Sequence, residues 1–151
     1  MKKDRDSVST PTYIHEFLNE KYFHEEGNIF DPCPLINNWD KSKHADGLKI
    51  KWGSDQQVFC NPPYSKACKF IAKACFEHEK FGTKIILLVK ISSICTQTFR
   101  KIHKKFKILF LDDRIQFDNF KRRAPFQSCF LLLGFPKSET FQVISMKPPS
   151  N

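Results

Sequence analysis

The chain has 151 residues, of which 40% are hydrophobic, so it is long enough to form one domain of ordinary size around a real core. Its formal net charge of +9 at pH 7 favours binding to a polyanion, most commonly nucleic acid, although solubility alone also explains such a charge. The polar start of the chain and the strand-sized apolar runs near 85–89 and 129–135 predict neither a signal peptide nor a membrane span.

Six cysteines are scattered along the chain without a Cys-x-x-Cys pair, and no histidine lies at zinc-ligand spacing from two of them. This pattern predicts reduced, mostly buried thiols instead of a disulfide framework, and it predicts no metal site. We therefore expect an intracellular protein that is not secreted.

The chain is predicted to begin with a flexible polar tail over 1–8, followed by a helix that starts at Ser9-Thr10-Pro11 with its proline near the first turn. Apolar and aromatic residues then recur at helical spacing: Tyr13, Ile14, Phe17, Leu18 and Tyr22. A short strand over 28–31 ends in the carboxylate of Asp31, and two nearby prolines stop it. Residues 35–55 are polar and loop-like, with a turn at Asp46-Gly47.

A second strand is predicted over 57–60, and a helix capped by Ser65 is predicted to run to about Lys80 and to end at Gly82. The near-continuous apolar run 84–89 is typical of a central parallel strand that is covered on both faces. The remaining predicted elements are a helix over 96–105, strands over 106–111, 114–117 and 129–135, an edge strand over 139–146 and a tail over 147–151.

Strands that alternate with helices imply an α/β domain over 9–146 with a mostly parallel sheet. The final strands follow one another through short connections, so we expect them to add an antiparallel edge at the C-terminal side of the sheet.

The tetrapeptide Asn61-Pro62-Pro63-Tyr64 follows the second strand directly. It suits a planar substrate that reacts through an exocyclic amine, whose lone pair is delocalised into the ring. The side-chain carbonyl of Asn61 and the backbone carbonyl of Pro62 can accept the two amine hydrogens, and Pro63 restricts the direction of the Pro62 carbonyl. Tyr64 can stack on the base. Catalysis of this kind rests on positioning and dipoles.

The same four residues also fit a proline turn with the tyrosine in the core. Ligands of open α/β sheets bind beyond the carboxyl ends of the strands, however, and both Asp31 and the tetrapeptide fall at such ends. We therefore expect them to line one crevice.

Further segments accompany the tetrapeptide in a fixed order: Ser9-Thr10-Pro11-Thr12, Phe30-Asp31-Pro32-Cys33-Pro34, Asp46-Gly47-Leu48, Trp52, Phe59-Cys60, Arg114-Ile115-Gln116-Phe117 and Ala124-Pro125-Phe126-Gln127-Ser128. In order and spacing this set resembles the phage-type DNA N6-adenine methyltransferase family, and the resemblance covers most of residues 9–135.

The resemblance implies a compact Rossmann-like methyltransferase fold with helices on both faces of the sheet, S-adenosylmethionine as cofactor, and double-stranded DNA with a flipped adenine as partner. It implies a catalytic role for Asn61, Pro62, Pro63 and Tyr64. It places Thr10 and Pro11 at the cofactor carboxylate, Asp31 beside its methionine part and Asp46 at its adenine. Pro32 and Cys33 belong to the same cofactor-binding set, and Cys33 and Pro34 are expected to shape the cofactor loop through backbone contacts.

Local chemistry offers an alternative for three of these residues. Thr10 is a natural helix N-cap. Asp31 is suited to cap a following turn, and Asp46 before Gly47 is an ordinary turn pair.

The chain departs from the wider pattern of methyltransferases in having no Gly-rich loop after the first strand and no separate target-recognition domain. Val89-Lys90 stands where the family tends to have Leu-Pro, so Lys90 is either a phosphate contact or a strand-end charge. Lys121, Arg122 and Arg123 form a predicted DNA-binding loop. The basic stretch 100–107 could also neutralise phosphates, but we favour a solvated helix face for it.

The predicted function is site-specific transfer of a methyl group from S-adenosylmethionine to N6 of adenine in DNA, in restriction-modification or in the marking of viral or phage DNA. This function implies that the protein is located in the host cytoplasm, the nucleoid or a viral factory. Two alternatives stay open: a methyltransferase that acts on RNA or on protein glutamine, and a degenerate, non-catalytic DNA-binding or structural subunit.

Overall fold

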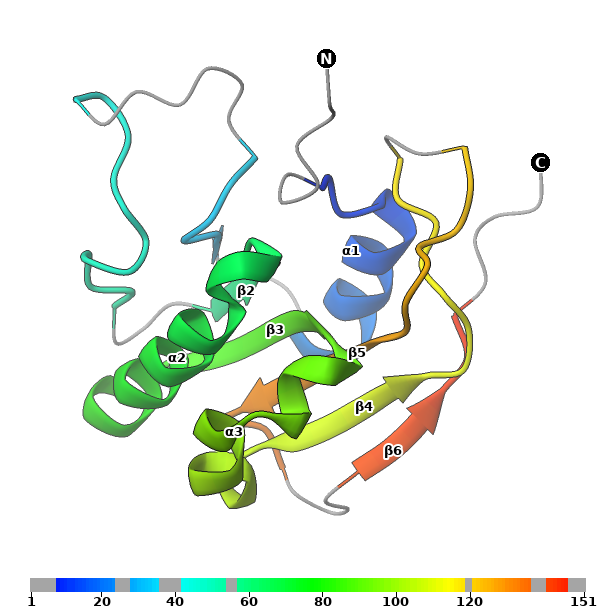
Figure 1. The fold of residues 1–151 in the computed structure, drawn as a ribbon. Coiled ribbons are helices and arrows are strands. Elements are labelled where there is room, and N and C mark those ends of the chain that lie inside the picture. Colours follow the sequence, from blue (N-terminus) through cyan, green and yellow to red (C-terminus); the bar gives the residue numbers. More distant parts are fainter. Residues whose placement is uncertain are drawn as a thin grey trace.

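One six-stranded sheet with helices on both faces forms the centre of the protein (Figure 1). This computed structural model describes residues 8–23, 28–35, 42–53, 57–118, 121–136 and 141–146. The predicted tails over 1–8 and 147–151 fall outside these ranges except for Val8, whose side chain packs against the core. The predicted division into one domain and two tails stays a prediction.

The strands are β1 (Ile29–Phe30), β2 (Gln57–Cys60), β3 (Lys84–Lys90), β4 (Lys107–Leu111), β5 (Ser128–Leu133) and β6 (Phe141–Ile144). Their order in the sheet is β1-β2-β3-β5-β4-β6. The pairs β1–β2, β2–β3 and β4–β6 are parallel, whereas β5 is antiparallel to both of its neighbours. The α/β class and the mostly parallel sheet are therefore confirmed.

The predicted antiparallel C-terminal edge is wrong. The antiparallel strand β5 lies inside the sheet, paired with β3 through Ile85↔Leu133 and with β4 through Ile108↔Leu131, and the edge strand β6 is parallel to β4. The connection 112–127 is long enough to bring the chain back between β3 and β4, which both precede β5 in the sequence. Strand patterning identifies the segments but carries no information on this insertion.

The helices are α1 (Thr12–Leu18), which continues as the π-helical turn η1 (Asn19–Phe23), α2 (Ala67–Phe81) and α3 (Gln97–Ile102). Three 3₁₀ turns accompany them: η2 (Tyr64–Lys66), η3 (Ile91–Cys95) and η4 (His103–Lys105). Gly82 ends α2 in the left-handed conformation with φ of 68°, as predicted. The N-cap of α2 is Lys66 and not Ser65, which belongs to the turn η2 before this helix.

The predicted strand over 114–117 is wrong, because these residues form an irregular segment without strand pairing. Ile115 and Phe117 are nevertheless buried, because the segment lies across one face of the sheet and packs on the same cluster as α1. The alternation that predicted a strand is thus explained by a loop with one buried side.

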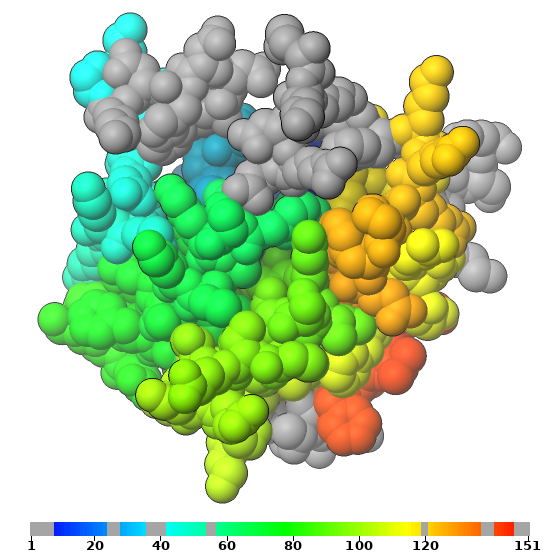
Figure 2. All heavy atoms as spheres, viewed as in Figure 1, coloured from blue at the N-terminus to red at the C-terminus, as the bar shows by residue number. Residues whose placement is uncertain are grey.

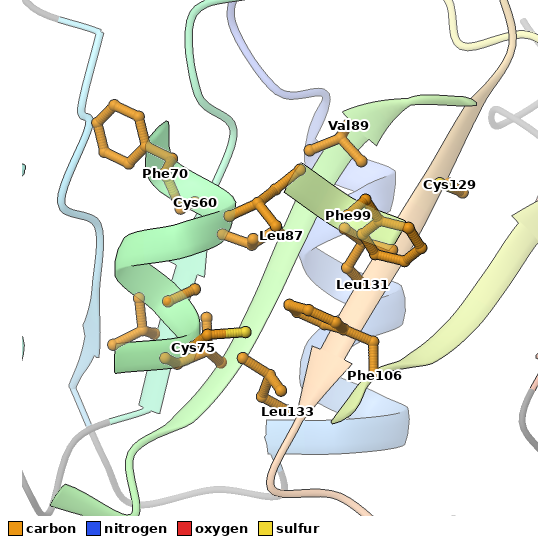
Figure 3. Close-up of a cluster of buried hydrophobic side chains, with 14 of the residues drawn as sticks. Cys60, Phe70, Cys75, Leu87, Val89, Phe99, Phe106, Cys129, Leu131 and Leu133 are labelled. Carbon is orange, nitrogen blue, oxygen red and sulfur yellow. The ribbon is translucent and has the colours of Figure 1, made fainter. Parts of the chain in front are cut away.

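Alternate residues of the central strands enter two separate cores. Ile85, Leu87 and Val89 of β3 pack with α2 and α3 on one face, where Phe70, Cys75, Phe99 and Phe106 complete the cluster (Figure 3). Ile86 and Leu88 pack with Ile14 and Leu18 of α1 on the other face. Burial on both faces explains the continuous apolar run of β3.

All six cysteines carry free thiols, three of them buried: Cys60, Cys75 and Cys129. In the part of the chain that the structure describes, no helix is both long enough and apolar enough to span a membrane.

Candidate functional site at the carboxyl edge of the sheet

The carboxyl ends of β1, β2 and β3 lie side by side, because these strands are adjacent and parallel. Asp31 follows β1, Asn61 follows β2 and Lys90 ends β3. The first residues of α1 lie at the same edge (Figure 1), and the side chain of Asn61 contacts the segment that precedes this helix. The expected gathering of Asp31 and the tetrapeptide at one edge is therefore observed.

The Asn61 amide is fixed by two acceptors that come from the start of the chain. Its Nδ2 donates to the backbone oxygen of Val8 at 3.3 Å and to Oγ1 of Thr10 at 3.1 Å. A backbone oxygen can only accept, so the orientation of the amide follows from chemistry: the nitrogen faces Val8. The Asn61 Oδ1, the acceptor that the proposed reaction requires, consequently points away from this segment.

Thr10 does not cap helix α1. The N-cap of this helix is Pro11, no side chain caps it, and the Pro11 carbonyl accepts from the Ile14 N–H at 3.1 Å. The capping interpretation of Thr10 is therefore wrong, and its hydroxyl is instead used on Asn61, 51 residues further along the chain. Pro11 is buried beside it.

The two prolines of the tetrapeptide have different local roles. Pro63 is extended with φ of −54° and ψ of 137°, and its carbonyl accepts from the Lys66 N–H at 2.9 Å to open the turn η2. Pro62 is buried between this turn and β2. The second proline thus starts a helical segment, while the first keeps the backbone carbonyl that the predicted amine grip uses.

Tyr64 belongs to a cluster of two rings and one cation. Its ring meets the ring of Phe126 edge to face, with centroids 5.1 Å apart. The Lys90 Nζ lies 3.7 Å from the centroid of Tyr64 and 4.2 Å from that of Phe126. Lys90 therefore lies against the aromatic rings of the site, which neither of its two sequence-based interpretations anticipated.

Asp31 is largely buried in the loop after β1. Its Oδ1 accepts from the Cys33 N–H at 2.8 Å, as a turn-capping carboxylate does. Burial raises the pKa of Asp31 from 3.8 to about 6, and the hydrogen bond from Cys33 opposes this shift only in part. Burial also raises the pKa of the Cys33 thiol to about 11 and that of Cys60 well above 9, so neither is a thiolate nucleophile at neutral pH.

Asp46 also closes its own turn, since its Oδ1 accepts from the Leu48 N–H at 3.0 Å. Gly47 packs so closely on the Asp31 loop that a Cβ at this position would lie 1.9 Å from the Pro32 oxygen. The Asp46 turn and the Asp31 loop are thus in contact. For both carboxylates the turn interpretation is confirmed, and their role in cofactor binding stays a prediction.

The predicted DNA-binding loop lies in the connection 112–127, which projects past the sheet at the upper right of Figures 1 and 2. Lys121, Arg122 and Arg123 are all exposed, and Arg123 forms an ion pair with Asp113. The loop is anchored by the Ala124 N–H, which donates to the Ile115 oxygen at 2.7 Å. Arg123 is thus engaged within the protein, and the DNA contacts of all three residues stay a prediction.

Three features of the site escaped the sequence-based reasoning: the bond from Asn61 to Thr10, the ring of Phe126 on Tyr64, and the contact of Gly47 with Pro32. In the sequence, these contacts were indicated only by the fixed order in which the segments containing Thr10, Gly47 and Phe126 accompany the tetrapeptide. A groove of about 390 Å³ lies elsewhere, between α2 and α3, and none of the predicted site residues lines it.

The fold and this edge define an α/β protein whose acidic, amide and aromatic groups gather beyond the carboxyl ends of parallel strands, where such sheets bind ligands. A family model described as DNA N-6-adenine-methyltransferase (Dam) matches residues 1–131, and the chain belongs to this family. The resemblance seen in the sequence is thus confirmed, and membership implies adenine-N6 methylation of DNA. Neither the curated proteins nor the solved structures gave a match to this chain.

Proposed function

We propose that the protein is a site-specific methyltransferase that transfers a methyl group from S-adenosylmethionine to N6 of a flipped adenine in double-stranded DNA. Family membership supports the reaction and the DNA substrate. The observation that carries the proposal is the Asn61 amide, whose nitrogen is held by Val8 and Thr10 while its oxygen is directed away from them.

The residues at the edge fit this cofactor. A buried carboxylate such as Asp31, with its pKa raised to about 6, calls for a cation beside it, and S-adenosylmethionine carries both an ammonium and a sulfonium group. Thr10 and Pro11 are proposed to hold the cofactor carboxylate, and Asp46 is proposed to bind its adenine. Pro32 and Cys33 are proposed to line the site between these two ends of the cofactor. The cofactor supplies a methyl group that the sulfonium makes electrophilic.

The chain's own groups prepare the substrate amine. The Asn61 oxygen and the Pro62 carbonyl would accept its two hydrogens, which withdraws the lone pair from the ring and directs it outward. Tyr64 would stack on the base, and Pro63 keeps the backbone between these groups rigid. No titrating base is needed for this step, because positioning and fixed dipoles supply the effect.

Phosphate contacts are proposed for Lys121 and Arg122, with Arg123 available once its ion pair with Asp113 opens. Lys90 is proposed to reach a phosphate next to the flipped base from its place on the aromatic rings. The flipped geometry is required because N6 is inaccessible to a methyl donor inside the duplex. Such an activity belongs in a DNA-containing compartment, in keeping with the intracellular expectation.

The test is a transfer assay with labelled S-adenosylmethionine and, in parallel, DNA, RNA and protein substrates. Wild type should label adenine in DNA, and Asn61→Ala should lose transfer by at least a hundredfold while it still binds cofactor. Asn28→Ala is the matched control, because this exposed asparagine lies before the amino end of β1. Transfer to RNA or protein alone, or full activity in Asn61→Ala, would refute the proposal.

A further inference from the structure

A buried carboxylate of helix α2 reaches into the loop that carries Asp46. Glu77 is 1% exposed, and its Oε2 accepts from the backbone N–H of Trp52 at 3.0 Å. Its other oxygen, Oε1, lies 2.6 Å from Nζ of Lys73, one turn earlier on the same helix. A buried carboxylate is tolerated only when it is paired and hydrogen-bonded in this way, so Glu77 fixes the Trp52 backbone to α2.

Trp52 passes this constraint on to the Asp46 turn. The indole is 1% exposed, it stacks near Phe70 with centroids 6.4 Å apart, and its Nε1 donates to the Gly47 oxygen at 2.8 Å. Gly47 in turn touches the Pro32 backbone. One continuous set of contacts therefore connects Glu77 of α2 to the Asp46 turn and to the Asp31 loop.

The segment 42–53 has no strand pairing of its own, so its position depends on such contacts. The second anchor is Thr83, whose Oγ1 donates to the Gly53 oxygen. Both anchors lie at the Trp52 end of the segment, and the indole bond runs from there back to the Asp46 turn, beside Leu48 and Ile50, which pack against the same core cluster. The indole bond thus helps to hold the Asp46 turn in place, and the contact of Gly47 with Pro32 joins this turn to the Asp31 loop.

We propose that Trp52 and Glu77 are positioning residues, which hold the Asp46 turn against the Asp31 loop and so set the affinity for the adenine-containing cofactor. The inference rests on the proposed function of these loops. Neither residue touches the reacting atoms, so their effect belongs in cofactor binding and not in the transfer step at saturating cofactor.

The informative variants change one residue each: the Trp52 variant removes one hydrogen bond, and the Glu77 variant removes one hydrogen bond and the ion-pair partner of Lys73. Trp52→Phe keeps an aromatic ring over Phe70 but removes the donor to Gly47, and Glu77→Ala removes the acceptor of the Trp52 N–H. Each should raise the Kd for S-adenosylmethionine in calorimetry by roughly three- to tenfold, the worth of one hydrogen bond. Glu77→Gln, made together with Lys73→Met so that no ammonium faces the new amide nitrogen, keeps a side-chain oxygen for the Trp52 N–H, so its Kd should stay within about twofold of wild type.

Thr96→Ala is the control for a loss of stability alone, because Thr96 caps α3 through the Phe99 N–H at 3.2 Å, away from both loops. It should lower the melting temperature without any change in cofactor Kd. The kcat at saturating cofactor should stay within about twofold of wild type in Trp52→Phe, measured well below its melting temperature. A positioning role predicts a raised cofactor Kd with an unchanged kcat, whereas partial unfolding would lower kcat as well.

A second readout needs no activity. In a Trp39→Phe background Trp52 is the single tryptophan, since the chain has two. Cofactor binding should change its emission, and the titration midpoint should move with Glu77→Ala but not with Glu77→Gln made together with Lys73→Met. Wild-type binding with an unchanged Kd in both Trp52→Phe and Glu77→Ala would overturn this inference alone. No cofactor binding by wild type would overturn the proposed function and the inference with it.

Discussion

Asp31→Asn should stabilise the cofactor-free protein at neutral pH while it weakens cofactor binding. The Asp31 carboxyl is largely buried, and desolvation raises its pKa from 3.8 to about 6. One pKa unit corresponds to about 1.4 kcal/mol, so a charged Asp31 lowers the free energy of unfolding by up to about 3 kcal/mol. Asparagine has a similar shape and keeps an oxygen for the Cys33 N–H, but it carries no charge to bury.

The raised pKa of Asp31 determines in which direction the stability changes with pH. Between about pH 4 and pH 6 the folded protein still holds the Asp31 proton that the unfolded chain has released, because burial raises the folded-state pKa. The stability that the neutral carboxyl contributes is therefore present below pH 4 and is lost as the pH rises towards 6. Asp31→Asn has no such loss, and other groups titrate alike in both proteins.

The assay is urea unfolding of both proteins between pH 4 and pH 7.5, analysed as the difference between them. This difference should grow in favour of Asp31→Asn by about 2–3 kcal/mol, equivalent to about 5–10 °C in melting temperature for a chain of this length. S-adenosylmethionine should reverse the order at pH 7.5, because its cationic groups stabilise only the charged aspartate. A difference that stays constant with pH would refute the assignment of a raised pKa to Asp31.

Two further substitutions test neighbouring contacts. Gly47→Ala places a Cβ against the Pro32 backbone, so we expect the free energy of unfolding in urea to fall by about 1–3 kcal/mol and the cofactor Kd in calorimetry to rise. An unchanged Kd would show that the contact does not shape the cofactor site. Lys90→Met keeps an apolar side chain on Tyr64 but loses the charge, so the slope of log Kd for DNA against the logarithm of the salt concentration should become shallower by about one. An identical slope would exclude a phosphate contact by Lys90.

Elements with a strong local signal were predictable from the sequence. The apolar run of β3 requires burial on both faces, and the glycine that ends α2 adopts a left-handed conformation that other residues avoid. Strand order was less accessible, because the place of β5 between β3 and β4 depends on how a long connection folds back. The false strand over 114–117 has the same origin, since tertiary burial of Ile115 and Phe117 imitates strand alternation.

The residues of the site were predictable as a set, but their contacts were not. The local preference of Thr10 for an N-cap is overridden by an amide that lies 51 residues away in the chain. Lys90 reads as a free strand-end charge until the rings of Tyr64 and Phe126 are placed beside it. Such pairings arise from the meeting of distant segments at one sheet edge, and no local pattern encodes them.

The central claim is that this chain methylates adenine N6 in DNA with S-adenosylmethionine as donor. The most direct measurement is mass spectrometry of nucleosides from duplex DNA that was incubated with the purified protein and a deuterated-methyl form of the cofactor. The account predicts N6-methyldeoxyadenosine that carries the heavy methyl group with wild type and its absence with Asn61→Ala. Unmodified deoxyadenosine after incubation with a wild-type protein that binds both cofactor and DNA would contradict it.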